Sequence, residues 1–99
     1  MDYSSVNTAA LILRAINQKD RKNMMKFIEE KASVNVSDIY IKLRMAQSEA
    51  WQHLSILRKA NVVTTTRKGK EIFYSLNYAR MIDVTAFVYG LTSITNSVQ

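Results

Sequence analysis

The sequence predicts a mainly helical α+β domain of the winged helix-turn-helix class, with the element order ααααββα, and three observations support this. Apolar residues recur at helical spacing over most of the chain. Two runs rich in Val, Thr, Ile, Phe and Tyr flank Lys68-Gly69, as expected for a β-hairpin, or wing. The 99 residues, 47% of them hydrophobic, suffice for one core, so we expect a single domain over residues 1–99.

The first helix is expected to begin after a cap at Ser5 or Asn7 and to extend to about Asn17. Its apolar residues surround the helix, and Arg14 is its only charge. A helix of this kind is buried on more than one side. In a chain of this length, we expect one of those sides to contact another subunit.

The second helix is expected over Arg21–Lys31, with Asp20 as its cap. Its apolar residues recur at helical spacing while its charged residues fall on the opposite side, which predicts one core-facing stripe. That stripe consists of Met24, Met25, Phe27 and Ile28. The next segment, Ala32–Val36, is expected to be a short link.

Ser37 and Asp38 are expected to begin a third helix of about two turns, and a turn over Arg44–Gln47 then leads to a fourth. Ser48 is expected to cap this fourth helix, which extends to Ala60. Two helices joined by a turn of about four residues form a helix-turn-helix unit. The residues of the fourth helix expected to face the core are Ala50, Leu54 and Leu57.

The wing is expected directly after the fourth helix. Asn61 tolerates the left-handed conformation that ends many helices. The β-rich runs Val62–Arg67 and Glu71–Leu76 follow, and Gly69 is expected to adopt a positive φ between them. Three basic residues at the tip are expected to contact phosphates or the minor groove, although such a tip also keeps a strand edge soluble. They are Arg67, Lys68 and Lys70.

The last helix is expected from about Tyr78 to Ser93 or beyond, with apolar residues on more than one face. We expect the first and last helices to form a homodimer interface. The alternative is a hydrophobic site for a partner or a small ligand. The expected interface residues are Leu11, Ile12, Ile16, Met81, Val84, Val88 and Leu91.

The whole net charge of +6 falls on the predicted helix-turn-helix and wing. Lys42–Lys70 contains seven Lys and Arg residues against Glu49 alone, whereas the other seven basic residues are balanced by seven acids. This concentration of charge is typical of a surface that binds a polyanion, with a solvated basic face as the alternative. Short hydrogen-bonding side chains, of the kind that reach base edges and phosphates, lie on the outer face of the fourth helix. They include Gln47, Ser48, Gln52 and Ser55.

The segment AQSEAWQHLSILRKANVVTTTRKGKEIFYSL resembles the ArsR family of bacterial winged-helix repressors. Asp20-Arg21 also lies where that family often has an Asp-x-x-Arg helix start, although here the two residues are adjacent. The residues that carry the resemblance are Gln47, Ser48, Gln52, His53-Leu54, Leu57-Arg58-Lys59-Ala60, Lys68-Gly69-Lys70 and Tyr74-Ser75-Leu76.

The resemblance implies a dimeric repressor that binds double-stranded DNA at a roughly two-fold operator. Its recognition helices would enter successive major grooves, about 10 base pairs apart. On that basis the candidates for base or phosphate contact are Gln47, Ser48 and Gln52. The candidates for phosphate contact are Arg44, Arg58, Lys59, Arg67, Lys68 and Lys70.

The chain departs from the metal-sensing members of that family. Where many have Cys-Val-Cys-Asp-Leu, this chain has the sulfur-free segment Asn35–Ile39. Other members use an Asp-x-His start and a later His in the last helix, but here Asp83 precedes Thr85 by two residues and no later His or Glu follows. Because zinc-type sites need about four ligands, we expect no metal or other cofactor. We expect His53 to pack between helices or to bond a phosphate.

Trp51 replaces a small residue that is common at this position in the family. A side chain that projects inward would fill the core, which we favour because tryptophan is large and highly buried on average. A side chain that projects outward would contact a DNA sugar or a protein.

The composition limits the remaining function classes. The absence of cysteine excludes disulfides and thiolate chemistry. No nucleophile–base pair, carboxylate pair or Gly-rich phosphate loop is visible, so we expect no enzyme activity. No signal peptide or membrane span is visible either, so we expect a cytoplasmic protein. The expected function is sequence-specific transcriptional regulation; the alternative is a winged-helix module that docks proteins through its apolar terminal helices.

Overall fold

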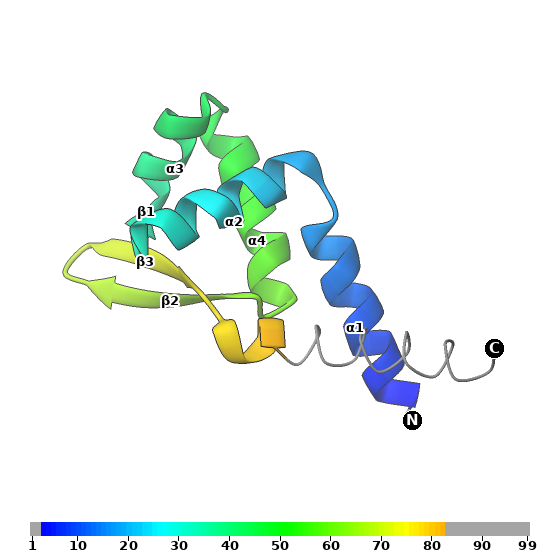
Figure 1. Ribbon diagram of the computed structural model, residues 1–99. Helices are drawn as coiled ribbons and strands as arrows, with labels where there is room; N and C mark the ends of the chain where they lie inside the picture. Colours follow the sequence, from blue (N-terminus) through cyan, green and yellow to red (C-terminus); the bar gives the residue numbers. More distant parts are fainter. Residues whose placement is uncertain (1–2, 83–99) are drawn as a thin grey trace.

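The computed structural model describes residues 3–82 and has the predicted winged helix-turn-helix fold (Figure 1). A further helix begins over residues 78–82, and the rest of the predicted last helix lies outside the described residues. The elements are α1 (Tyr3–Ile16), α2 (Lys19–Lys31), β1 (Val34–Asn35), α3 (Val36–Leu43), α4 (Gln47–Lys59), β2 (Val63–Lys68) and β3 (Glu71–Leu76).

The sheet has three antiparallel strands in the order β1-β3-β2. The hairpin register runs from Val63 opposite Leu76 to Lys68 opposite Glu71, as the two β-rich runs predict. The predicted link before α3 is wrong, because it contains β1, whose Val34 pairs with Tyr74. A strand of two residues is too short to show alternation, so only its pairing reveals it. This pairing attaches the wing to the start of α3.

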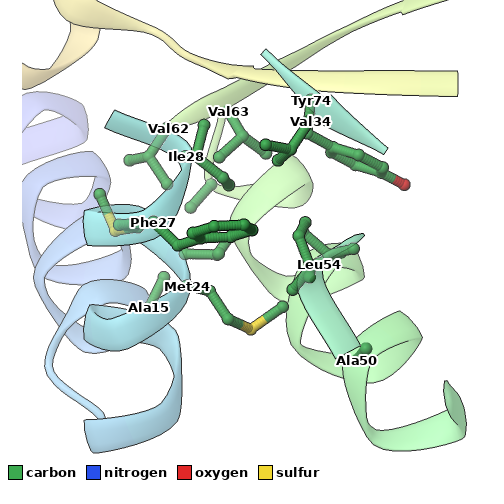
Figure 2. Packing of buried hydrophobic residues seen from close by; sticks show 14 of the residues in the cluster. Ala15, Met24, Phe27, Ile28, Val34, Ala50, Leu54, Val62, Val63 and Tyr74 are labelled. Atoms are coloured by element: carbon green, nitrogen blue, oxygen red, sulfur yellow. The ribbon is translucent and has the colours of Figure 1, made fainter. Parts of the chain in front are cut away.

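The core lies between α2, α4 and the sheet, and it contains both predicted helix stripes (Figure 2). Each fully buried Leu, Ile, Val or Met side chain contributes roughly 1.5–3 kcal/mol. The side chains that are almost completely buried include Met24, Ile28, Ile39, Leu54, Leu57, Val62 and Val63. The inner face of α4 is therefore held against the core by Ala50, Leu54 and Leu57.

The predicted caps of the first two helices are wrong. α1 already begins at Tyr3, which places Ser5 and Asn7 inside the helix. The cap of α2 is Gln18, whose side-chain oxygen accepts a hydrogen bond from the backbone N–H of Arg21 at 2.8 Å. Asp20 lies in the first turn instead. An acid is favourable at either position because both are close to the positive end of the helix dipole, so composition alone does not distinguish them.

The two helices of the helix-turn-helix also begin earlier in the chain than predicted. Asn35 caps α3 by accepting from the backbone N–H of Asp38 at 2.9 Å, so the predicted start at Ser37 is late. α4 follows Ala46, which makes no side-chain cap, and Ser48 lies in its first turn. The predicted cap at Ser48 is therefore wrong, and its hydroxyl is exposed on the helix surface.

Both helices of the helix-turn-helix end in a left-handed residue. Arg44 has a φ of 53° after α3, and Asn61 has a φ of 62° after α4, as predicted for Asn61. In each case the next N–H bonds back to the carbonyl five residues earlier: Met45 to Tyr40 and Val62 to Leu57, both at 3.1 Å. This paired arrangement satisfies the free carbonyls at a helix end. Gly69 also has the predicted positive φ, of 64°.

Asn77 connects the end of α4 to the last helix. Its side-chain Nδ2 donates to the carbonyl oxygen of Asn61 at 2.9 Å, and its Oδ1 accepts from the backbone N–H of Arg80 at 3.2 Å. The second bond caps the helix over 78–82. One side chain therefore ties the start of the predicted dimerisation helix to the end of α4.

Candidate nucleic-acid interface

The structure places all ten predicted DNA-contacting residues at the surface. The buried residues Ala50, Leu54 and Leu57 hold one face of α4 against the core, so the opposite face is free. The exposed residues are Arg44, Gln47, Ser48, Gln52, Ser55, Arg58, Lys59, Arg67, Lys68 and Lys70.

One stripe of α4 gathers the polar candidates. Ser48, Gln52, Ser55 and Lys59 follow one another at spacings of four, three and four residues, so they lie on one side of the helix. Side chains at these spacings present hydroxyl, amide and ammonium groups to the same space. That is the mixture of donors and acceptors that reads base edges and phosphates in a major groove.

The wing displays its three cations in a partly ordered arrangement. It extends away from the helices (Figure 1), and its tip carries Arg67, Lys68 and Lys70. Arg67 Nε donates to the carbonyl oxygen of Gly69 at 3.1 Å, which leaves the other guanidinium N–H groups directed elsewhere. Lys68 Nζ lies 5.3 Å from the centroid of the Phe73 ring, a cation–π distance. These contacts reduce the freedom that the side chains would lose on binding a phosphate.

Tyr74, in β3, joins the wing to the hydrophobic core. The residue is buried, and its hydroxyl oxygen points away from the cluster (Figure 2). Burial raises the pKa of the Tyr74 phenol, and the Arg58 guanidinium acts in the opposite direction. The phenol therefore stays neutral at physiological pH and adds no negative charge next to the basic surface.

His53 lies in a polar cluster between the helices. Its Nδ1 lies 3.2 Å from Arg21 Nη1, and its Nε2 lies 3.6 Å from Asp20 Oδ2. Arg21 Nε also donates to the carbonyl oxygen of Ala15. Because Arg21 and His53 are 32 residues apart in the chain, the local sequence does not reveal the contact between them. The cluster connects the end of α1, the start of α2 and the middle of α4, and it agrees with the helix-packing role expected for His53.

The start of α2 differs from the Asp-x-x-Arg pattern with which Asp20-Arg21 was compared. The cap of α2 is Gln18, three residues before Arg21, which is the spacing of the Asp-x-x-Arg pattern. Gln18, and not Asp20, therefore has the three-residue spacing to Arg21 at this helix start. Within residues 3–82, no group of three or more His, Cys, Asp or Glu side chains could hold a metal ion. Over the same range, no helix is long and apolar enough to cross a membrane.

The predicted dimer interface requires one correction. Ile12 is only 1% exposed and belongs to the core of the single chain, so it has no surface left for a partner. Its neighbour Leu11 is 51% exposed. Ile16 and Met81 pack partly against the core, whereas Val84, Val88 and Leu91 lie outside the described residues.

The favoured placement of Trp51 in the core is wrong, because the side chain is 41% exposed. Successive residues of a helix point about 100° apart. Ala50 faces the core, so the next residue falls at the border of the outer face. The angular position on the helix outweighs the preference of a large aromatic side chain for burial.

The comparisons agree with this geometry. The family described as "Bacterial regulatory protein, arsR family" matches residues 18–65, which include α2, the helix-turn-helix and the start of the wing. The transcriptional repressor PagR of Bacillus anthracis is 27% identical over 99 residues, covering 100% of this chain and 92% of PagR. The transcriptional repressor SdpR of Bacillus subtilis strain 168 is 29% identical over 66 residues, covering 67% of this chain and 72% of SdpR.

Solved structures show the same fold. The crystal structure of PagR matches with a TM-score of 0.72 and 28% identity, covering 83% of this chain and 95% of that chain. An ArsR-like transcriptional regulator from Rhodococcus sp. RHA1 matches with a TM-score of 0.87 at 16% identity, covering 95% and 88% respectively. Sequence, fold and relatives therefore agree that residues 18–65 form a domain of the ArsR family of bacterial regulatory proteins.

Proposed function

We propose that this protein is a sequence-specific, double-stranded DNA-binding transcriptional repressor that acts as a homodimer in the cytoplasm and not as an enzyme. The observation that carries the proposal is the distribution of charge. The net charge of +6 falls within residues 42–70, and the candidate contact residues of that segment are all exposed on the helix-turn-helix and wing. A module built only for protein docking has no need of this distribution.

In the proposed complex, α4 lies in the major groove and the wing follows the adjacent backbone. Gln47, Ser48 and Gln52 contact base edges, because amide and hydroxyl groups can match their donor and acceptor patterns. We assign Ser55, which is exposed about one turn later, to a phosphate contact. The phosphate contacts otherwise come from Arg44, Arg58, Lys59, Arg67, Lys68 and Lys70, which set the register but not the sequence.

The dimer proposal rests on the exposed apolar side chains of α1 and of the helix over 78–82. Leu11 is 51% exposed, Tyr78 57% and Ile82 66%. Two copies related by a two-fold axis would cover such residues and present their recognition helices to successive major grooves. We propose that residues 1–99 form one domain, with the terminal helices as the dimerisation elements.

The proposal is tested by titrating the protein with the DNA upstream of its own gene and with a random duplex while the salt concentration is raised. We expect both duplexes to bind at low salt and only the upstream DNA to remain bound at physiological salt. Log affinity should fall linearly with log salt, because each phosphate contact releases counterions. Native mass spectrometry of the complex should give two chains of 11.4 kDa per duplex.

Two outcomes contradict the proposal in different ways. No binding to either duplex at low salt would exclude a DNA-binding regulator and favour the docking module. One chain per duplex, with normal affinity, would retain the DNA-binding function but exclude the dimer.

The substitution Arg44→Gly is expected to change thermal stability and DNA affinity in opposite directions. Its left-handed φ of 53° costs about 1 kcal/mol relative to glycine, so Arg44→Gly is expected to raise the thermal midpoint. The same change removes a proposed phosphate contact and should lower affinity for all duplexes about fivefold. Asn61→Gly is the matched control, because it introduces glycine at another left-handed helix end, with a φ of 62°, without removing a charge. If both variants bind DNA like the wild type, Arg44 contacts no phosphate.

A further inference from the structure

Trp51 is the only tryptophan of the chain, and it lies on the helix proposed to enter the major groove. The side chain is 41% exposed. It follows Ser48 by three residues and precedes Ser55 by four, so it shares a helix face with both. The indole therefore presents apolar surface beside the short hydrogen-bonding side chains proposed to contact DNA.

The surroundings on α4 do not form an apolar docking patch. The neighbours of Trp51 at three or four residues are Gln47, Ser48 and Ser55, all exposed, together with the buried Leu54. Surfaces that dock proteins present contiguous apolar area. The exposed Arg58, seven residues after Trp51, lies on the same side of α4 in its last turn, and the exposed Arg44 lies in the turn before the helix. This arrangement matches a surface with phosphates at its ends and an apolar group between them.

We propose that Trp51 determines specificity by packing its indole against the 5-methyl groups of thymine in the major groove, which rests on the proposed DNA-binding function. Thymine is the only base that presents a methyl group there, and apolar side chains recognise it by contact. Gln52 and Ser48 supply hydrogen bonds on the adjacent part of the face. The apolar contact adds a preference for A·T pairs that hydrogen-bonding side chains at this position would not provide.

The proposal is tested on a duplex selected by the wild-type protein from a random library. Each thymine of one half-site is replaced in turn by deoxyuridine, which removes only the methyl group. We expect one or two positions at which wild-type affinity falls about three- to fivefold, the effect of uncovering one apolar carbon. In Trp51→Ala the same replacement should have no further effect, since the contact is already lost.

Ile56→Ala is the matched control. Ile56 lies on the same helix and is also 41% exposed, but five residues from Trp51, and therefore on a different face. It should leave the deoxyuridine effect unchanged. Fluorescence of the single tryptophan should also change when the wild type binds the selected duplex. Trp51→Phe retains an aromatic ring and is used in the same cycle if the alanine variant melts early.

The proposal is overturned if deoxyuridine weakens the wild type and Trp51→Ala by the same factor, or if it weakens neither. Binding of all variants to a random duplex at low salt is measured in parallel. Loss of that binding in the wild type would refute the DNA-binding function itself, whereas normal low-salt binding without coupling would refute only the thymine contact.

Discussion

Replacing Arg67, Lys68 and Lys70 together by alanine is expected to weaken binding to every duplex by on the order of 100-fold at physiological salt. Counterion release makes each phosphate contact worth about fivefold under these conditions. The slope of log affinity against log salt should become shallower by about 2.7, which is about 0.9 for each lost contact. The ratio of affinities for operator and random DNA should change little, because phosphate contacts carry no sequence information.

The fold should tolerate this change. All three side chains are exposed, and their contacts with Gly69 and Phe73 lie at the tip of the wing, away from the core. Surface substitutions of this kind usually alter the free energy of unfolding by less than about 0.5 kcal/mol each. A loss of affinity with a normal thermal midpoint would therefore report contacts with DNA and not unfolding.

A matched variant separates local contacts from total charge. Lys22, Lys26 and Lys31 are exposed on α2, outside the basic segment, and their replacement by alanine removes the same charge. This variant should retain most of its affinity, because long-range effects of charge are screened within about 10 Å. Equal losses in both triple variants would refute a specific role for the wing.

The features that the sequence predicted are those encoded by local periodicity. The stripe from Met24 to Ile28 and the face containing Ala50, Leu54 and Leu57 recur at helical spacing, and both are buried. The left-handed residues Asn61 and Gly69 were also predictable, because few residue types tolerate a positive φ. The concentration of the net positive charge in residues 42–70 could also be predicted, because it follows directly from the sequence.

The features that the sequence did not predict depend on a backbone or helical angle, or on residues that are distant in the chain. β1 exists because Val34 and Asn35 meet β3 about 40 residues later in the chain. Arg44 at a left-handed position is invisible to propensity, which disfavours arginine there. The size of Trp51 favours burial, whereas one residue of helical rotation past the buried Ala50 leaves it exposed. In each case the tertiary arrangement overrides the local preference.

Among the substitutions proposed here, Leu54→Ala is expected to lower the free energy of unfolding the most. Leu54 is 1% exposed and packs in the core from the middle of α4 (Figure 2). Truncating a buried leucine leaves a cavity and costs about 2–5 kcal/mol. Because domains of this size are stable by roughly 5–15 kcal/mol, the change removes a large share of the total. The thermal midpoint should fall by more than about 10 °C.

The same substitution should weaken DNA binding without removing any proposed contact, since α4 would no longer be held in a single orientation. Ser55→Ala is the control, because it alters the exposed neighbour and should change the free energy of unfolding by less than about 0.5 kcal/mol. Urea unfolding of both variants, at one protein concentration because a dimer is expected, measures the difference. If Leu54→Ala unfolds at the wild-type midpoint, the face of α4 that presents Gln52 and Trp51 to DNA is not fixed by this core. Recognition would then depend on the order that DNA itself imposes on the helix.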